Sequence, residues 1–304
     1  MVWQSSRFSI DLASPKVMGI VNLTPDSFSD GAQLGSVRAS LRHCERLIAD
    51  GAHILDIGAE STRPGAMPVP VDEELARLLP VLREAVALGV PVSVDTYKPA
   101  VMQAALELGA DIINDVWGLR WSDPTPGADP LTAVQVLQRH GSCGVCLMHM
   151  HGEPQNMQAS PMRGDVVAQV LAFWQERARA LQTVGVEAAR IVVDPGIGFG
   201  KTVAQNFALL ARLPELLAGG FPVAVGWSRK SSLAAMTGNS LATVATLDTQ
   251  GRMVPSVAAA LLSVERGARL VRVHDVRETV QVLKVLEAVD LAAAGGHDNQ
   301  GTGR

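Results

Sequence analysis

Short runs of apolar, often β-branched residues alternate along the chain with longer stretches in which apolar residues recur at helical spacing. Each short run is followed by a polar or glycine-containing segment, and this order of strand and helix is typical of a parallel sheet. The predicted strands are 16–22, 53–58, 91–95, 111–115, 144–150, 191–194, 222–226 and 270–275. The predicted helices include 72–88, 99–108, 166–184, 203–217 and 257–266.

Eight repeats of this unit favour closure of the sheet, so the predicted fold class is α/β, a (β/α)8 TIM barrel in a single domain. The number of repeats alone leaves an open, doubly wound sheet as the alternative. We expect an N-terminal segment at 1–14, the barrel at 15–290 and a disordered, small and polar tail at 291–304. Residues 117–130 and 237–252 are expected to form long loops.

The composition is rich in aliphatic residues: 47% of the chain is hydrophobic but only 4% is aromatic. Such a core suits parallel strands that are buried on both faces. A net charge of −4 without clustered basic residues indicates neither a nucleic-acid nor an acidic-membrane partner. The N-terminus lacks signal-peptide features, no apolar run could span a bilayer, and three cysteines suit reduced thiols, so a cytoplasmic protein is expected.

A polar side chain ends each predicted strand, where a buried strand would otherwise be apolar. In a barrel the carboxyl ends of all strands open onto one face, which is where such enzymes carry their chemistry. Because an unpaired buried carboxylate is costly, repetition of this feature predicts an active face rather than isolated helix caps. The ring comprises Asn22, Asp56, Asp95, Asn114, Asp115, His149, Asp194, Ser228, Lys230, Arg272 and His274.

The ring holds two kinds of chemistry. The carboxylate and amide side chains that could bind the donor-rich edge of a flat, nitrogen-rich heterocycle are Asp95, Asn114 and Asp194. The cations, which come late in the chain where barrels commonly bind phosphate, are Lys230, Arg272 and His274. The pattern thus predicts a heterocycle on one side and a phosphate on the other. Asp56 could equally be structural, and His149 is not assigned.

Two polar loops and two misleading motifs complete the pattern. Residues 22–31 and 60–65 are dense in hydroxyls and carboxylates, which indicates either ordinary turns or, beside the polar ring, active-site lids.

Residues 195–202 nearly match a phosphate-binding loop, but Pro195 stands where a glycine N–H is needed, so a pocket wall is the better interpretation. Cys143 and Cys146 lack a second cysteine pair and are interpreted as buried thiols.

Seven separate motifs together resemble the dihydropteroate synthase family, the folate-pathway enzymes that sulfonamides inhibit. The resemblance spans about residues 15–285, and the family usually has glycine where this chain has Ala32 and Ala59. The motifs are VMGIVNLTPDSFSDG (17–31), GAHILDIGAESTRPG (51–65), VSVDTYKP (92–99), ADIINDV (110–116), VDPGIGFGKT (193–202), GWSRKS (226–231) and RVHD (272–275).

The resemblance implies a homodimeric transferase that joins 7,8-dihydropterin-6-ylmethyl diphosphate to 4-aminobenzoate, giving 7,8-dihydropteroate and diphosphate. It implies Mg²⁺ as a cofactor, bound through Asn22, and catalytic roles for Asp95, Asp194, Lys230 and Arg272. The implied pterin ligands are Asp95, Asn114, Asp194 and Lys230, and the diphosphate ligands are Arg272, His274 and Asn22. Around the second substrate or leaving group the resemblance implies Phe28, Thr62, Arg63, Pro64, Phe199 and Ser228, and Met148 is expected at the pocket edge.

The expected chemistry is a dissociative, SN1-like displacement without a serine or cysteine nucleophile. Two alternatives remain: a pterin-binding methyltransferase barrel and a catalytically inactive pterin-binding homologue. Residues 228–231 (SRKS) and 24–31 (TPDSFSDG) argue against the methyltransferase, since it needs neither cations for a diphosphate nor loops for a benzoate. The intact polar ring argues against an inactive homologue.

Overall fold

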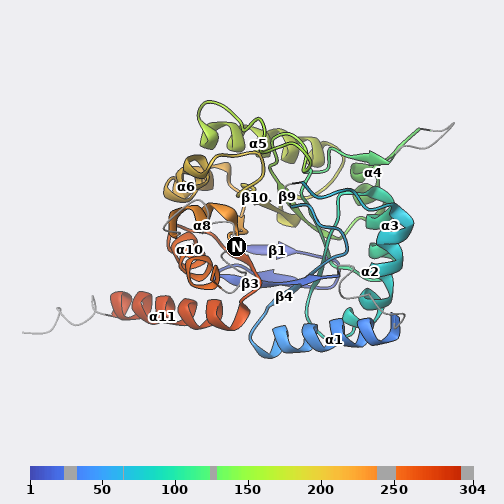
Figure 1. Ribbon diagram of the computed structural model, residues 1–304, viewed down its shortest axis with the longest axis horizontal. Coiled ribbons are helices and arrows are strands. Elements are labelled where there is room, and N and C mark those ends of the chain that lie inside the picture. Colours follow the sequence, from blue (N-terminus) through green and yellow to red (C-terminus); the bar gives the residue numbers. More distant parts are fainter. Residues whose placement is uncertain (24–32, 64, 124–128, 238–250, 296–304) are drawn as a thin grey trace, which may run out of the picture.

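Eight parallel strands form the centre of the molecule, and helices surround them (Figure 1). The computed structural model describes residues 1–23, 33–63, 65–123, 129–237 and 251–295. The strands are hydrogen-bonded in the order β10-β9-β6-β5-β4-β3-β12-β11. A parallel bridge between Val193 and Val223 links the first and last of these strands, so the sheet closes. The predicted (β/α)8 barrel is confirmed.

The observed barrel strands lie within the predicted runs. They are β3 (Lys16–Asn22), β4 (Ile54–Gly58), β5 (Val92–Asp95), β6 (Ile112–Asp115), β9 (Gly144–Met148), β10 (Ile191–Asp194), β11 (Ala224–Val225) and β12 (Leu270–Val273). The helices are α1 (Gln33–Ala49), α2 (Val71–Ala85), α3 (Pro99–Glu107), α4 (Ala133–His140), α5 (Val166–Thr183), η2 (Ala188–Arg190), α6 (Val203–Ala211), α7 (Leu213–Leu216), η3 (Leu217–Gly219), α8 (Ser231–Thr237), α10 (Met253–Glu265) and α11 (Val276–Gly295).

Three expectations need correction. The helix predicted at 203–217 is divided at Arg212 into α6, α7 and η3, because Pro214 lacks an N–H and would clash in a helix interior. Residues 291–295 of the predicted tail belong to α11, and the rest of the tail lies outside the described residues. The predicted loop 117–130 and the residues after it supply a short antiparallel ribbon, β7 (Ser122–Asp123) with β8 (Leu131–Thr132). Most of 237–252 lies outside the described residues.

The N-terminal segment closes one end of the barrel. Its two strands, β1 (Val2–Gln4) and β2 (Ser9–Asp11), pair as an antiparallel hairpin, and the N-terminus lies in the middle of the ring of helices in Figure 1. Trp3 is 0% exposed, and its indole N–H donates to the Arg190 carbonyl at 2.9 Å. Ile10 and Leu12 join Trp3 against the apolar interior of the barrel. The hairpin therefore covers the amino end of the barrel interior.

No helix in the described part of the chain is both long and apolar enough to cross a membrane.

Candidate active site

The period-two alternation of β-strands determines which side chains point into the barrel. Inside the barrel, next to the N-terminal hairpin, the side chains form an apolar cluster. Two residues farther along three of the strands, the inward side chain is polar. These pairs are Ile54 and Asp56 on β4, Ile112 and Asn114 on β6, and Leu270 and Arg272 on β12. The polar layer lies nearer the open end of the barrel, and because it is largely shielded from water its members must satisfy one another.

Arg272 is the centre of this polar layer. Its Nε lies 2.5 Å from Asp56 Oδ2 and its Nη2 lies 2.6 Å from Asp95 Oδ2. Asp56 is fully buried, and it also accepts hydrogen bonds from Ser93 Oγ at 2.6 Å and from Asn114 Nδ2 at 3.2 Å. Burial acts to lower the pKa of Arg272, but the charges of the two carboxylates outweigh it and the pKa rises. The guanidinium therefore stays charged and links three strands.

Asp95 has one oxygen that the protein does not satisfy. Its Oδ2 pairs with Arg272, whereas Oδ1 is buried without a hydrogen-bond partner among the described residues. Burial raises the pKa of Asp95 to about 7, although the Arg272 charge opposes this. A fixed, buried acceptor of this kind suits a ligand that brings its own N–H donors.

Asp194 and Lys230 lie on the other side of the mouth. Burial raises the pKa of Asp194, opposed by the Gly196 N–H, which donates to Oδ1 at 2.7 Å. Lys230 Nζ lies 4.2 Å from the centroid of the Phe199 ring, a cation–π contact. Burial, assisted by the Arg272 charge, lowers the pKa of Lys230 to about 8. The mouth thus places a cation and an aromatic face near a buried carboxylate.

The segment 195–202 forms a closely packed wall. An added Cβ would lie 1.9 Å from the His149 carbonyl oxygen at Gly196 and 2.0 Å from that of His151 at Gly200, and both glycines have positive φ. Lys201 is buried, and its Nζ donates to backbone carbonyls, including those of Gly196 and Phe199, each at 3.0 Å. Because the lysine is used internally, this segment is not a phosphate-binding loop.

A left-handed residue shapes the segment after β11. Arg229 has φ 60°, an unusual conformation for a residue with a side chain, and its guanidinium pairs with Asp275 at 2.7 Å. Its neighbour Ser228 bonds to His274, and its other neighbour Lys230 contacts Phe199. Strained backbone of this sort is concentrated at functional sites.

His274 differs from the sequence-based expectation of a cation. Burial and the charges of neighbouring arginines lower its pKa to about 3, so its ring is neutral at pH 7. Ser228 Oγ accepts the His274 backbone N–H at 3.1 Å and lies 2.9 Å from Nδ1, to which its hydroxyl can donate. Nε2 lies 3.5 Å from Asn22 Nδ2, and the neutral ring carries its single hydrogen on one of the two ring nitrogens. His274 therefore offers a neutral imidazole instead of a positive charge.

The loop after β4 reaches this mouth. Thr62 is half-buried and Arg63 is exposed, and the Arg63 charge contributes to lowering the pKa values of Lys230 and His274. Met148 is buried in the same apolar cluster as Phe199, close to the polar layer. Two other expected residues, Phe28 and Pro64, lie outside the described residues.

The alternation also identifies which strand-end residues do not belong to the site. His149 follows the inward-facing Met148, and its ring contacts Phe173 of α5 edge-on at 5.0 Å, with a pKa lowered to about 2 by burial. Asp115 accepts the backbone N–H groups of the loop that follows it, at 2.7 and 2.6 Å. Asp56, in contrast, is central to the site. The inward orientation of Asp56 could have been predicted from the sequence, because it stands two positions after Ile54 on the same strand and therefore shares its face.

Two cysteines near β9 are buried thiols. Cys143 and Cys146 are buried, and burial raises the pKa values of both thiols. Among the residues that the structure describes, no group of three or more histidine, cysteine, aspartate or glutamate side chains could hold a metal ion. The interpretation of these cysteines as buried thiols agrees with both observations.

Comparison with known proteins identifies the family. The model of the pterin binding enzyme family matches residues 18–274. A dihydropteroate synthase of Neisseria meningitidis serogroup C is 47% identical over 293 residues, covering 95% of this chain and 98% of that protein. A Burkholderia cenocepacia dihydropteroate synthase, solved with 7,8-dihydropteroate, superimposes with a TM-score of 0.83 at 49% identity, covering 97% and 98% of the two chains. A Xanthomonas albilineans dihydropteroate synthase with 4-aminobenzoic acid gives 0.80 at 47%, covering 93% and 95%. The chain belongs to the dihydropteroate synthase family of pterin binding enzymes.

Proposed function

We propose that this protein condenses 7,8-dihydropterin-6-ylmethyl diphosphate with 4-aminobenzoate to form 7,8-dihydropteroate and diphosphate, a transferase step of folate biosynthesis. The observation that carries the proposal is the Arg272 network, which holds Asp95 with one buried oxygen still free to accept. A dihydropterin presents several N–H groups along one flat edge, and Asp95, Asn114 and Asp194 supply acceptors of the matching kind.

The remaining residues suit the displacement. The methylene carbon–oxygen bond breaks with its electron pair leaving on the diphosphate, and the pterin ring delocalises the positive charge left on the methylene. The fixed carboxylates Asp95 and Asp194 stabilise that cation electrostatically without a covalent bond. Arg272 and Arg63 attract the departing diphosphate, and the neutral His274 donates a hydrogen bond. The aromatic amine then attacks the methylene, forms the carbon–nitrogen bond and loses a proton.

Mg²⁺ is proposed to arrive with the diphosphate. Magnesium prefers oxygen ligands and often binds through one or two protein groups together with substrate phosphates. Asn22, exposed at the end of β3 beside His274, offers one amide oxygen of this type. The bound ion would neutralise charge that develops on the leaving group. The described residues fit such a shared site better than a cage made of protein alone.

A homodimer is also proposed. Helices α10 and α11 pack together and carry several exposed apolar side chains, which a second copy of the chain could cover. These side chains are Val254, Leu262, Val285, Val289 and Leu291. Light scattering is expected to give twice the chain mass of 32.1 kDa, and a single-chain mass would contradict the proposal.

The buried, unpaired thiols suit the reducing cytoplasm, where we place the enzyme.

The reaction itself is tested by diphosphate release from the purified protein. Release is expected only when both 4-aminobenzoate and the pterin diphosphate are present. We expect it to stop when Mg²⁺ is chelated and to fall when a sulfonamide competes with 4-aminobenzoate. Release that does not depend on 4-aminobenzoate would contradict the proposed function. Chromatography of the reaction mixture then identifies the product as dihydropteroate.

Pterin binding is expected to strengthen as pH rises from 5.5 to 7.5. The free protein holds Asp95 with a pKa of about 7, and the pterin edge requires the ionised form, so binding below pH 7 must release a proton. The association constant should fall by up to about tenfold for each pH unit below the pKa. Lys230, with a pKa of about 8, stays mostly charged over this range.

Calorimetric titration with the pterin diphosphate measures this dependence. The Asp95→Asn variant, which cannot ionise at this position, should bind more weakly with a flatter pH profile. A wild-type affinity that does not change with pH would contradict the assignment of Asp95 as a pterin ligand.

A further inference from the structure

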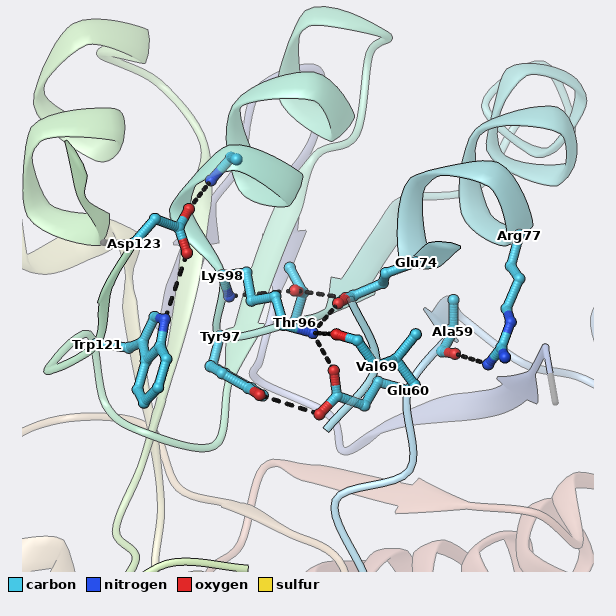
Figure 2. Close-up of polar contacts among 11 residues, drawn as sticks. Ala59, Glu60, Val69, Glu74, Arg77, Thr96, Tyr97, Lys98, Trp121 and Asp123 are labelled. Atoms are coloured by element: carbon cyan, nitrogen blue, oxygen red, sulfur yellow. Dashed lines mark hydrogen bonds and ion pairs between the residues drawn. The ribbon is translucent and has the colours of Figure 1, made fainter. Parts of the chain in front are cut away.

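A buried ion cluster, which shares no residue with the polar layer, connects the loop after β4 to α2 and to the start of α3 (Figure 2). Lys98, at the start of α3, donates from its Nζ to the carboxylates of Glu60 and Glu74. The same Nζ also donates to the Val69 carbonyl at 2.7 Å. The side chains of Lys98 and Glu60 are each only 6% exposed, and that of Glu74 is 1% exposed. All three charges are thus largely removed from water.

Such a cluster is expensive unless every member is bonded. Burial raises the pKa of Glu74, and the Lys98 charge acts against that rise. Glu74 Oε1 accepts the Thr96 hydroxyl at 2.7 Å, and Glu60 Oε1 accepts the Tyr97 hydroxyl at 3.0 Å. Apolar side chains at these positions could pack without this cost, so the arrangement calls for an explanation other than stability alone.

The cluster connects the loop after β4 with α2 and with the end of β5, whose relative positions matter for the proposed reaction. Lys98 donates hydrogen bonds to both ends of this loop, to the Glu60 carboxylate near its start and to the Val69 carbonyl near its end. Through Glu74 it ties the loop to α2, and Glu74 in turn bonds Thr96, the residue directly after Asp95. One ammonium group therefore sets the position of the loop relative to the carboxylate at the barrel mouth.

Other contacts leave this loop incompletely supported. The loop borders a cavity of about 140 Å³ lined in part by Ser61, Ala66, Tyr97 and Trp117. Dense apolar packing therefore does not fix the loop on this side. Among the described residues of the loop, a further hydrogen bond runs from the Gly65 N–H to the Pro154 carbonyl at 3.0 Å.

We propose that Lys98 is a positioning residue that holds the loop after β4 so that Thr62 and Arg63 meet the second substrate. The proposal rests on the proposed function, because it assigns the loop to 4-aminobenzoate. Lys98 is proposed to contact neither substrate and to act through Glu60, Glu74 and Val69. Its loss should therefore affect the second substrate and leave the pterin, held by strand residues, nearly unaffected.

The test compares Lys98→Met with the wild-type protein. Methionine keeps the apolar stem but removes the ammonium group. We expect the KM for 4-aminobenzoate to rise about tenfold or more, because small misplacements of substrate-orienting groups are costly. The affinity for the pterin diphosphate, measured by calorimetry, should change less than about twofold. Amide hydrogen exchange over residues 59–70 should become faster.

Two further variants separate positioning from simple destabilisation. Lys98→Met combined with Glu74→Gln removes the more deeply buried of the two carboxylates that lose their cation, so it should recover part of the lost stability while the KM defect persists. Arg190→Met removes another buried cation at the closed end of the barrel, where Arg190 donates to the Cys143 carbonyl at 2.7 Å. It should lower stability without raising the KM for 4-aminobenzoate.

The outcomes are distinguishable. A normal KM in Lys98→Met, unchanged exchange over residues 59–70, or a KM defect that disappears when stability is recovered would each overturn the positioning role. An equal loss of affinity for both substrates would also overturn it. If the wild-type protein forms no dihydropteroate, the proposed function fails, and the exchange measurement still decides whether Lys98 restrains the loop.

Discussion

The double pairing of Arg272 with Asp56 and Asp95 is the interaction on which the mouth of this barrel depends. Asp56 is 0% exposed, and an ionised carboxylate in that position requires a nearby cation and further donors. Arg272 supplies the charge, and Ser93 and Asn114 supply the donors. The same guanidinium orients Asp95 and leaves one of its oxygens available. The guanidinium that offsets the cost of burying Asp56 therefore also fixes Asp95 with its Oδ1 free to bind a ligand.

The rest of the site is arranged around that interaction by the barrel itself. Period-two alternation puts an apolar layer below the polar one, and the N-terminal hairpin seals the apolar end with Trp3. The loops then add groups that strands cannot offer. The left-handed Arg229 separates Ser228 from Lys230, and the loop after β4 brings Arg63 toward the same mouth. Rigid strands thus hold the proposed pterin, while loops surround the proposed second substrate and leaving group.

Much of this arrangement was predictable from sequence because strands and their ends leave periodic signals. All eight barrel strands fall within predicted runs, and Asp95, Asn114 and Arg272 were expected in the polar ring where the structure has them. Local pattern could not give the neutral state of His274, because burial and distant arginines determine its pKa. The Lys98 cluster was missed for a similar reason, since Glu60 and Glu74 lie 38 and 24 residues away in sequence.

The most direct test of the central claim compares two buried aspartates at opposite ends of the barrel. Asp56 pairs with Arg272 at the open end, and Asp111, also 0% exposed, pairs with Arg7 at the closed end at 2.6 Å. Changing either to asparagine should lower the free energy of unfolding. The measurement is the calorimetric affinity of each folded variant for the pterin diphosphate. Asp56→Asn should lose about tenfold or more, because Arg272 and Asp95 are no longer held in place, whereas Asp111→Asn should bind within about twofold of wild type. Equal affinities in Asp56→Asn and the wild-type protein would contradict the account.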